Sequence, residues 1–504
     1  MTDNRWNLVI RGARIFDGTG AAPFVGDLAV RGDRIAAVGE VEGAAVLERA
    51  AVSEIDARGL ALAPGFIDVH SHDDFAVLTT PAMDFKLMQG VTTEVVGNCG
   101  MGAAPYKAVR EHFGIFFGDA AMPGWEGYRG YLEVVERAPP SLNVAMLIGH
   151  NTIRAAVMGM ARRAPTQDEQ RAMRELVREG LEAGAVGFST GLIYEPGRHC
   201  ATEEVIELTR DVAEAGGLYA THMRNEASGL IDAVREAIRI GRESGARVQI
   251  SHHKAAGKSN WGRVRESIKL IEEARAEGLD VTADQYPYTS GSTLLAAVLH
   301  NNVFNPQGDR GGIARIEPER VLIASAPLHP EYEGQTIAEL AIRLNLSPED
   351  AARKVDSDEQ HHAIAILDMM DEGDVQTVMR HPTTMIGSDG IPLGGKPHPR
   401  LYGTFARVLG HYARELGLLT MQDAVHRMTG MPAQKFGLAD RGVLRAGAHA
   451  DLVIFDPETV IDTGTFNEPK RYPAGIVHVF VNGVAVVTNG RHTNARPGRA
   501  LRRG

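Results

Sequence analysis

Eight short apolar segments alternate with amphipathic helical segments through the middle of this 504-residue chain. An alternation of strand-length apolar runs with helices is typical of a parallel sheet built from βα units. The eight segments read LALAPGFIDVHSH, TTEVVGNCG, NVAMLIGH, GAVGFSTGL, GLYATHM, ARVQISHH, LDVTADQYPY and TTMIGSDG. Because eight such units close into a ring, the sequence predicts an α/β fold with a TIM-type (β/α)8 barrel.

The two ends of the chain have a different pattern. Residues 1–60 and 436–504 contain short alternating strands with Gly and Asp turns, including a hairpin signal at Asn-Gly 482–483. Each end is too small to bury much core alone, so we expect the two to pack together as a small β-sandwich. Residues 61–435 form the predicted barrel, and residues 290–381 are too long for one crossover. We therefore expect an inserted lid subdomain over the barrel mouth.

The composition of the chain limits the kinds of molecule that it can be expected to bind. The chain has 53 Lys and Arg against 64 Asp and Glu, a formal charge of −11, which argues against a nucleic-acid surface. No apolar run is long enough for a membrane span, and the start lacks the apolar core of a signal peptide. The only cysteines, Cys99 and Cys200, are too few for a disulfide framework, so a thiol can serve as a metal ligand. We expect a cytoplasmic enzyme with a small-molecule substrate and no nucleic-acid or membrane partner.

Candidate metal ligands follow the predicted strands, where a barrel carries its catalytic groups. They are His70, His72, Cys99, His222, His252 and Asp389. Side chains at i and i+2 share a strand face, so His70 and His72 point the same way. On the sixth strand His252 and Lys254 share a face that His253 does not, and we place His252 in the mouth. Cysteine, histidine and carboxylate ligands together suit zinc.

Several motifs together resemble one enzyme family. APGFIDVHSHDD, GVTTEVVGNCG, GFSTGLIY, THMRNE, SHHK, YPY and IGSDG are similar to the amidohydrolase superfamily, and within it to the N-acyl-D-amino-acid deacylase (D-aminoacylase) family. The likeness covers nearly the whole chain, including the split sandwich and the insertion. Cys99 stands in the region where hydantoinases and dihydroorotases usually use a carboxylated lysine. The resemblance implies zinc-dependent hydrolysis of the amide bond of N-acyl-D-amino acids.

The resemblance also implies a role for each matching residue. It implies a tight zinc site formed by Cys99, His222 and His252. It also implies a second, weaker metal site formed by His70 and His72. Asp389, beside the second site, is implied as the general acid and base. The residues implied to bind substrate are Lys254, Tyr288 and Arg400 at its carboxylate and Tyr194 near the scissile carbonyl.

The preferred side chain is read from the segment after YPY. Family members that prefer acidic D-residues place a basic residue there, whereas TSGSTLLAAVLHNNVF has no Lys or Arg. We therefore expect a neutral, hydrophobic side chain, with His300 as the one residue that argues otherwise. Two alternatives stay open: an amidohydrolase for cyclic amides or unusual dipeptides, and a scaffold that has lost its chemistry.

Structural roles also remain open for several polar residues. Lys254 and Arg400 need anionic partners if they are buried, and Glu226 or Asp284 could supply them. Arg224 and Glu226 could equally form a structural pair. Two further residues are expected in the core or in loops: His150 and Cys200.

Overall fold

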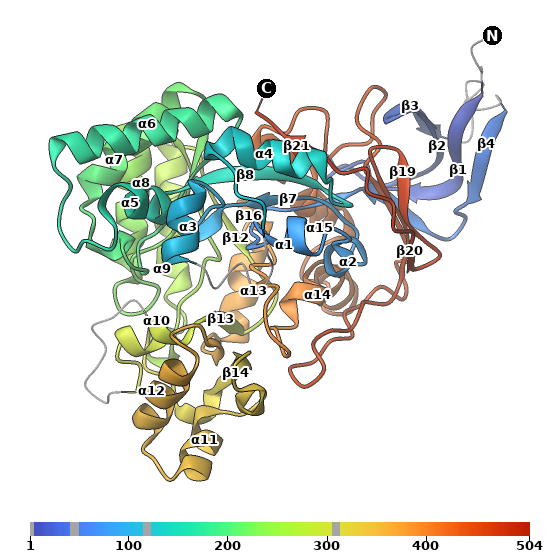
Figure 1. Ribbon diagram of the computed structural model, residues 1–504. Coiled ribbons are helices and arrows are strands. Elements are labelled where there is room, and N and C mark those ends of the chain that lie inside the picture. Colours follow the sequence, from blue (N-terminus) through green and yellow to red (C-terminus); the bar gives the residue numbers. More distant parts are fainter. Residues whose placement is uncertain (1–4, 41–49, 114–121, 305–312, 504) are drawn as a thin grey trace.

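A computed structural model describes residues 5–40, 50–113, 122–304 and 313–503. Eight parallel strands form the predicted barrel at the centre of the molecule (Figure 1). They are β6 (Phe66–Asp68), β7 (Val91–Val96), β8 (Asn143–Gly149), β9 (Gly187–Gly191), β10 (Leu218–His222), β11 (Arg247–Ile250), β12 (Val281–Gln285) and β16 (Thr384–Ile386). A parallel bridge between Ser71 and Gly390 joins the first strand region to the last, so the ring closes beside His70 and Asp389.

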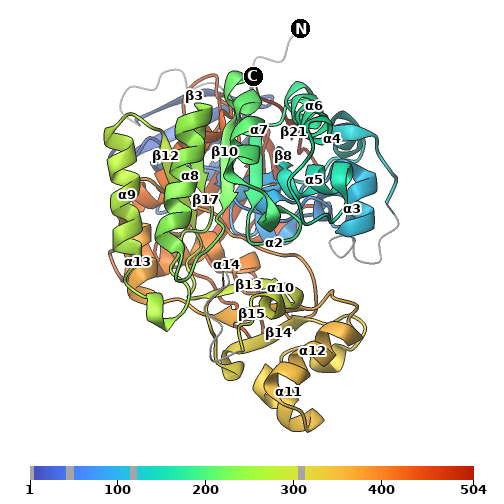
Figure 2. The same cartoon turned by 90° about the vertical axis from the view of Figure 1, so that its left-hand side faces the viewer.

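Amphipathic helices cover the outside of the barrel. The principal ones are α6 (Gln167–Ala183), α7 (Thr202–Glu214), α8 (Leu230–Ser244), α9 (Val264–Ala276) and α13 (Glu372–Arg380). Thr166 and Glu169 form a capping box at the start of α6, and α8 ends at Gly245, whose φ is +82°. Figure 2 shows α7, α8 and α9 side by side on the outer surface.

The strands of the two chain ends join in one nine-stranded hydrogen-bonded sheet. They are β1 (Trp6–Ile15), β2 (Phe24–Arg31), β3 (Arg34–Glu40), β4 (Ala51–Asp56), β5 (Ala61–Pro64), β17 (Leu452–Phe455), β18 (Ile476–Val481), β19 (Val484–Thr488) and β20 (Arg491–His492). The hairpin at 482–483 joins β18 to β19 as predicted. Leu8, Leu28 and Phe480 share one buried cluster, so both ends contribute to a single core.

The first predicted strand proves to be two. Residues 61–64 belong to the chain-end sheet, and residues 66–68 start the barrel. Gly65 lies between them, and a Cβ added there would lie 2.2 Å from the side chain of Thr92. The apolar run is continuous because both pieces are buried, which hid the change of sheet.

The insertion before β16 has its own antiparallel sheet in the order β13-β15-β14. Its elements are β13 (Ser290–Leu294), α10 (Leu295–His300), β14 (Val321–Ser325), α11 (Ile337–Leu344), α12 (Pro348–Asp358) and β15 (Ile364–Asp368). Residues 305–312 of the predicted insertion lie outside the described residues. Helix α13 packs on α9, β12 and β16, so this stretch of the predicted insertion is a barrel helix.

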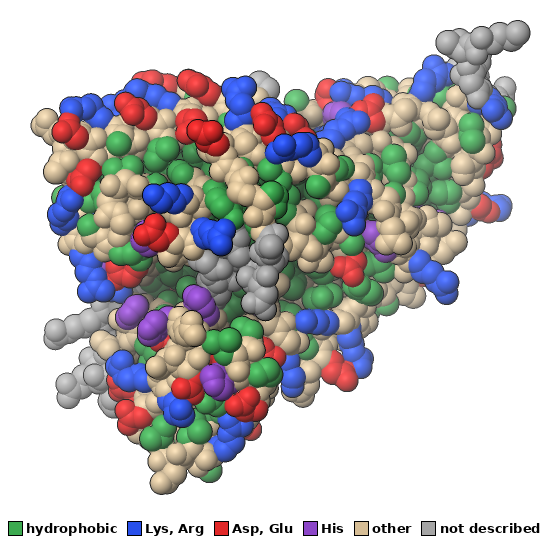
Figure 3. Space-filling view, in the orientation of Figure 1, with side chains coloured by type: hydrophobic (Ala, Val, Ile, Leu, Met, Phe, Trp, Pro, Cys, Tyr) green, Lys and Arg blue, Asp and Glu red, His purple; other side chains and the backbone are tan. Residues whose placement is uncertain are grey.

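The charged side chains are distributed over the surface as in an ordinary globular protein. Acidic and basic side chains are interspersed on the face shown in Figure 3, which is hollowed between the barrel and the insertion. In the part of the chain that the structure describes, no helix has the length and apolarity needed to cross a membrane.

Candidate metal centre and substrate cavity

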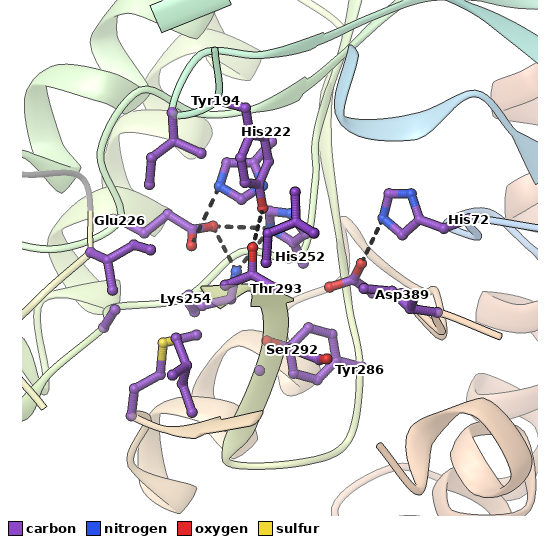
Figure 4. Close-up of a pocket in the computed structure, with 18 of the residues that line it drawn as sticks. His72, Tyr194, His222, Glu226, His252, Lys254, Tyr286, Ser292, Thr293 and Asp389 are labelled. Carbon is purple, nitrogen blue, oxygen red and sulfur yellow. Dashed lines mark hydrogen bonds and ion pairs between the residues drawn. The ribbon is translucent and has the colours of Figure 1, made fainter. Parts of the chain in front are cut away.

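A cavity lies between the carboxyl ends of the barrel strands and the insertion. One side carries polar side chains, among them His72, His222, His252 and Asp389 (Figure 4). The other side is apolar, and Leu294, Ile313, Ile364, Leu367 and Met369 line it. The cavity therefore joins a cluster of ionisable groups to a hydrophobic wall.

Cys99 lies at the centre of three imidazoles. Its Sγ is 3.3 Å from Nε2 of His70, 3.7 Å from Nδ1 of His222 and 3.6 Å from Nε2 of His252. Tetrahedral ligands at the usual Zn–S and Zn–N distances of about 2.3 and 2.1 Å are separated by about 3.6 Å. Cys99, His70 and His252 also form a buried group whose ligand atoms lie within 4.8 Å of one another. The donor types and the spacing both fit zinc.

Two buried carboxylates orient these imidazoles from behind. Asp284 Oδ1 lies 3.1 Å from Nδ1 of His70 and accepts a hydrogen bond of 2.8 Å from the backbone N–H of His252. Glu226 Oε1 is 3.0 Å from Nδ1 of His252, and its Oε2 is 3.8 Å from Nε2 of His222. A carboxylate on the far nitrogen fixes the tautomer of a metal-binding histidine and strengthens it as a ligand.

A second ligand group adjoins the first. Asp389 Oδ1 lies 3.1 Å from Nε2 of His72 and 3.4 Å from Nε2 of His70. His70, His72 and Asp389 thus form a candidate metal group that shares His70 with the Cys99 cluster. His70 was assigned to the second site, but it contacts both Cys99 and Asp389 and therefore belongs to both ligand groups.

The charges of neighbouring groups shift the pKa values of Cys99 and His72. Burial alone would raise the pKa of the Cys99 thiol, but the charge of His70 and hydrogen bonds from His222 and His252 lower it well below its usual value. Burial lowers the pKa of His72, yet its hydrogen bond to Asp389 and the neighbouring Cys99 raise it to about 9. A site that stabilises a thiolate and collects positive charge is suited to a cation.

Three of these side chains stand on left-handed backbone. The φ angles are +54° at Cys99, +36° at His252 and +50° at Asp389. Such angles are uncommon for residues other than glycine, and they concentrate at functional sites. The backbone N–H of Asp389 is held by the carbonyl of His70 at 2.8 Å. At Gly191, beside Cys99, an added Cβ would lie 2.1 Å from the Cys99 carbonyl oxygen, so only glycine permits this close approach.

Lys254 lines the cavity but already has an anionic partner. Its Nζ donates to Glu226 Oε1 at 2.6 Å and lies 2.8 Å from Nδ1 of His252. Burial lowers the pKa of Lys254, and the charge of Glu226 outweighs that effect and raises it. An ammonium group has three N–H donors, and the hydrogen bond to Glu226 uses one of them.

Arg400 lies behind the cavity wall. Its guanidinium is fully buried, 3.0 Å from Asp389 Oδ2, and stacks over the ring of Tyr286 at 4.4 Å. Burial would raise the pKa of Asp389, but Arg400 and then His70 lower it well below its usual range. Arg400 was expected to reach the substrate, with Glu226 or Asp284 as its alternative partner; the structure pairs it with Asp389 instead.

The tyrosines also differ from expectation. The hydroxyl of Tyr194 lies 3.2 Å from Oγ1 of Thr293, on the insertion strand β13, and its side chain lines the cavity. Tyr288 points elsewhere and donates to Asp462 Oδ2 at 3.2 Å. Of the two tyrosines in the YPY motif, Tyr286 lines the cavity.

Other polar residues are placed away from the cavity. His253 bonds Ser267 at 2.8 Å, and His150 bonds Glu204 at 2.9 Å. Arg224 pairs with Glu236 at 2.9 Å, so it does not form the structural pair with Glu226. His300 is exposed. Cys200 is buried, and burial raises its pKa to about 12.

A buried lysine supports the seam where the barrel closes. Lys86 Nζ donates to Asp68 Oδ2 at 2.6 Å and to Ser388 Oγ at 2.8 Å, and it lies 3.0 Å from Asp73 Oδ2. Asp68 also accepts from the backbone N–H of Ser388 at 2.8 Å. These contacts tie the strand before His70 to the turn before Asp389. Sequence reasoning missed Lys86 and Asp68, although a lone Asp in an apolar strand is a signal.

Comparisons with known proteins show which family the chain resembles over its whole length. The sequence profile of the amidohydrolase family matches residues 53–487. The chain is 44% identical to a D-aminoacylase and 41% identical to an N-acyl-D-glutamate deacylase, both from Alcaligenes xylosoxydans xylosoxydans; the matches cover 99% of this chain and 98% and 96% of those proteins. A crystal structure of N-acyl-D-glutamate deacylase from Bordetella bronchiseptica with zinc and a phosphonate inhibitor superimposes with a TM-score of 0.89 at 41% identity, covering 99% of this chain and all of that one.

Proposed function

The chain belongs to the amidohydrolase family and hydrolyses the amide bond of N-acyl-D-amino acids, and we propose that it acts on substrates with a neutral, hydrophobic side chain. The observation that carries the proposal is the single cavity in which the Cys99 cluster, Asp389 and Lys254 face an apolar wall. We also propose that the protein works in the cytoplasm, because its two cysteines are both free, as a reducing compartment keeps them.

We assign the zinc to Cys99, His222 and His252, with His70 and His72 available for a second ion near Asp389. Zinc, when bound, supplies Lewis-acid activation of water and of the scissile carbonyl. Asp389 is held in its charged form by Arg400 and can accept a proton from water and pass it to the departing nitrogen. Tyr194 lines the cavity, and we assign it the donation of a hydrogen bond to charge that develops on the carbonyl oxygen.

Substrate binding rests on the remaining cavity residues. Lys254 lines the cavity and can donate an N–H to the α-carboxylate, and we assign to Tyr286, which also lines the cavity, the role predicted for Tyr288. Arg400 acts on Asp389 rather than on the substrate. Among the described residues, Lys254 and Arg400 near the cavity already pair with Glu226 and Asp389, so a second carboxylate on the substrate finds no unpaired cation there. Burying an unpaired carboxylate costs several kcal/mol, which corresponds to discrimination of about 100-fold or more.

A substrate panel with zinc-reconstituted protein tests this proposal. We expect N-acetyl-D-Leu, N-acetyl-D-Met and N-acetyl-D-Phe to be hydrolysed at least about 100-fold more efficiently than N-acetyl-D-Glu. Faster turnover of N-acetyl-D-Glu would reject the side-chain proposal, and turnover of hydantoin or dihydrouracil alone would favour the cyclic-amide alternative. Leu367→Arg supplies the missing cation in the apolar wall and is expected to raise the D-Glu to D-Leu ratio.

A further inference from the structure

Cys99 lies in a tight turn that follows β7 and packs over the end of the neighbouring strand β8. Gly149 ends β8, and a Cβ added there would lie 2.6 Å from the backbone nitrogen of Gly102 and 2.7 Å from the carbonyl oxygen of Gly100. The turn and the strand end are therefore in direct backbone contact. This close approach allows the Cys99 thiol to reach His222, at the end of the more distant strand β10.

The backbone of this turn has an unfavourable conformation at the cysteine. The φ angles are +82° at Gly97, +54° at Cys99 and +76° at Gly100. Glycine adopts such angles readily, whereas the left-handed region is costly for a residue with a side chain. A cysteine keeps this conformation only where the surrounding structure holds it there. The direction of the Cys99 Sγ therefore depends on the contacts that hold the turn.

The hydroxyl of Ser189, in strand β9, holds the turn at both ends. It accepts a hydrogen bond from the backbone N–H of Gly100 at 3.0 Å and donates one to the carbonyl oxygen of Gly97. Ser189 is fully buried. Without its hydroxyl, a buried backbone donor and a buried backbone acceptor would both lose a partner, which favours rearrangement of the turn.

Thr152 holds the chain just after the turn. This residue lies in α5 (His150–Met158), and its Oγ1 accepts a hydrogen bond from the backbone N–H of Gly102 at 3.0 Å. Thr152 is fully buried as well. Serine and threonine hydroxyls are not the usual ligands of zinc, so both residues act on the site through the backbone that carries Cys99.

We infer that Ser189 is a positioning residue of the metal centre and that Thr152 assists it. The Ser189 hydroxyl fixes the Cys99 turn and so directs the thiolate toward the metal. The inference rests on the proposed function and on the assignment of Cys99 as a zinc ligand, and it deepens both. Groups that orient metal ligands from outside typically change metal affinity or activity by about 10–100-fold when they are removed.

Ser189→Ala tests the inference through metal binding rather than turnover. The zinc Kd is measured by competition with a chromophoric chelator. Cobalt(II)-substituted protein reports on Cys99 through the thiolate-to-cobalt charge-transfer absorption in the near ultraviolet. We expect Ser189→Ala to raise the zinc Kd by about 10–100-fold and to weaken or shift this absorption. Thr152→Val should change both quantities in the same direction.

Thr190→Val is the matched control from the next position of β9. Thr190 is also fully buried, and its hydroxyl bonds the hydroxyls of Tyr219 and Thr221 at 2.9 and 2.8 Å. Successive residues of a strand point to opposite faces, so this hydroxyl lies on the other side of β9 from Ser189. Both substitutions should lower stability in urea denaturation, but only Ser189→Ala should change the zinc Kd and the cobalt absorption.

The outcomes separate positioning from general stability. A folded Ser189→Ala protein with the parental zinc Kd and cobalt absorption overturns the inference, and so does an equal change in Thr190→Val. If circular dichroism shows that Ser189→Ala does not fold, Thr152→Val decides, and parental values in that variant overturn the inference. A parent cobalt protein without thiolate absorption overturns the assignment of Cys99 itself. No hydrolysis of any N-acyl-D-amino acid by the zinc-loaded parent overturns the proposed function.

Discussion

Replacing Lys86 with methionine removes a buried cation from the seam that joins the first and last barrel strands. Lys86 is fully buried, and its charge lies against Asp68 and Asp73 at 2.6 and 3.0 Å. Burial lowers the pKa of Lys86, but these carboxylates outweigh that effect and raise it, so the side chain is charged. Methionine keeps an unbranched, apolar stem, and the change therefore isolates the ammonium group.

The magnitude follows from the contacts. Lys86 donates two hydrogen bonds, to Asp68 and to Ser388, and hydrogen bonds that involve a charged group contribute about 1.5–3 kcal/mol each, which gives about 3–6 kcal/mol. Removing one partner of a buried ion pair costs about 3–5 kcal/mol because the other charge is stranded. We therefore expect Lys86→Met to lower the free energy of unfolding by about 3–5 kcal/mol in urea denaturation followed by circular dichroism.

The matched control is Lys354→Met on the surface of the insertion. Lys354 pairs with Asp358 at 3.0 Å, but 45% of its side chain is exposed, so the loss should stay below about 1 kcal/mol. Adding Asp68→Asn to Lys86→Met should recover part of the stability, since it neutralises one stranded anion. A Lys86→Met protein within about 1 kcal/mol of the parent would refute the reasoning.

Three further substitutions test the site and the linkage of stability to pH. Asp389→Asn should retain zinc by elemental analysis while kcat falls by about 10²–10⁴-fold. Tyr194→Phe should lower kcat by about 10²-fold with little change in KM, as loss of one donor to the developing oxyanion does; an unchanged kcat would remove Tyr194 from the mechanism. Burial lowers the pKa of Lys435 from 10.5 to about 8, against the attraction of Asp280. The folded protein then loses this proton before the unfolded chain does, so stability should rise between these two pH values by about 3 kcal/mol at most; Lys435→Met should abolish that rise in urea denaturation.

The parts of the site that sequence reasoning located depend on local rules. The i, i+2 rule named His70, His72 and His252, which contact Cys99 or Asp389, although β6 ends at Asp68 and β11 ends at Ile250, so these histidines lie just beyond their strands. Glu226 follows His222 by four residues in the same loop, so its proximity was also accessible from spacing. These features need only the strand ends and the closure of the barrel.

The parts that were missed depend on where the chain turns and on distant partners. Alternation fails after β12, because the chain leaves the strand at Gln285 and Tyr288 then points to Asp462. Arg400 finds Asp389 only through the packing of α14 (Arg400–Arg407) beneath the cavity. No short-range pattern in the sequence specifies such a pair.

Zinc K-edge X-ray absorption on reconstituted protein tests most directly whether a thiolate and imidazoles from separate strands hold the metal. The parent protein should show one sulfur at about 2.3 Å among nitrogen and oxygen ligands. Cys99→Ala should lose that sulfur together with most N-acetyl-D-Leu hydrolysis, whereas Cys200→Ala should keep both. A spectrum without sulfur in the active parent protein would contradict the account.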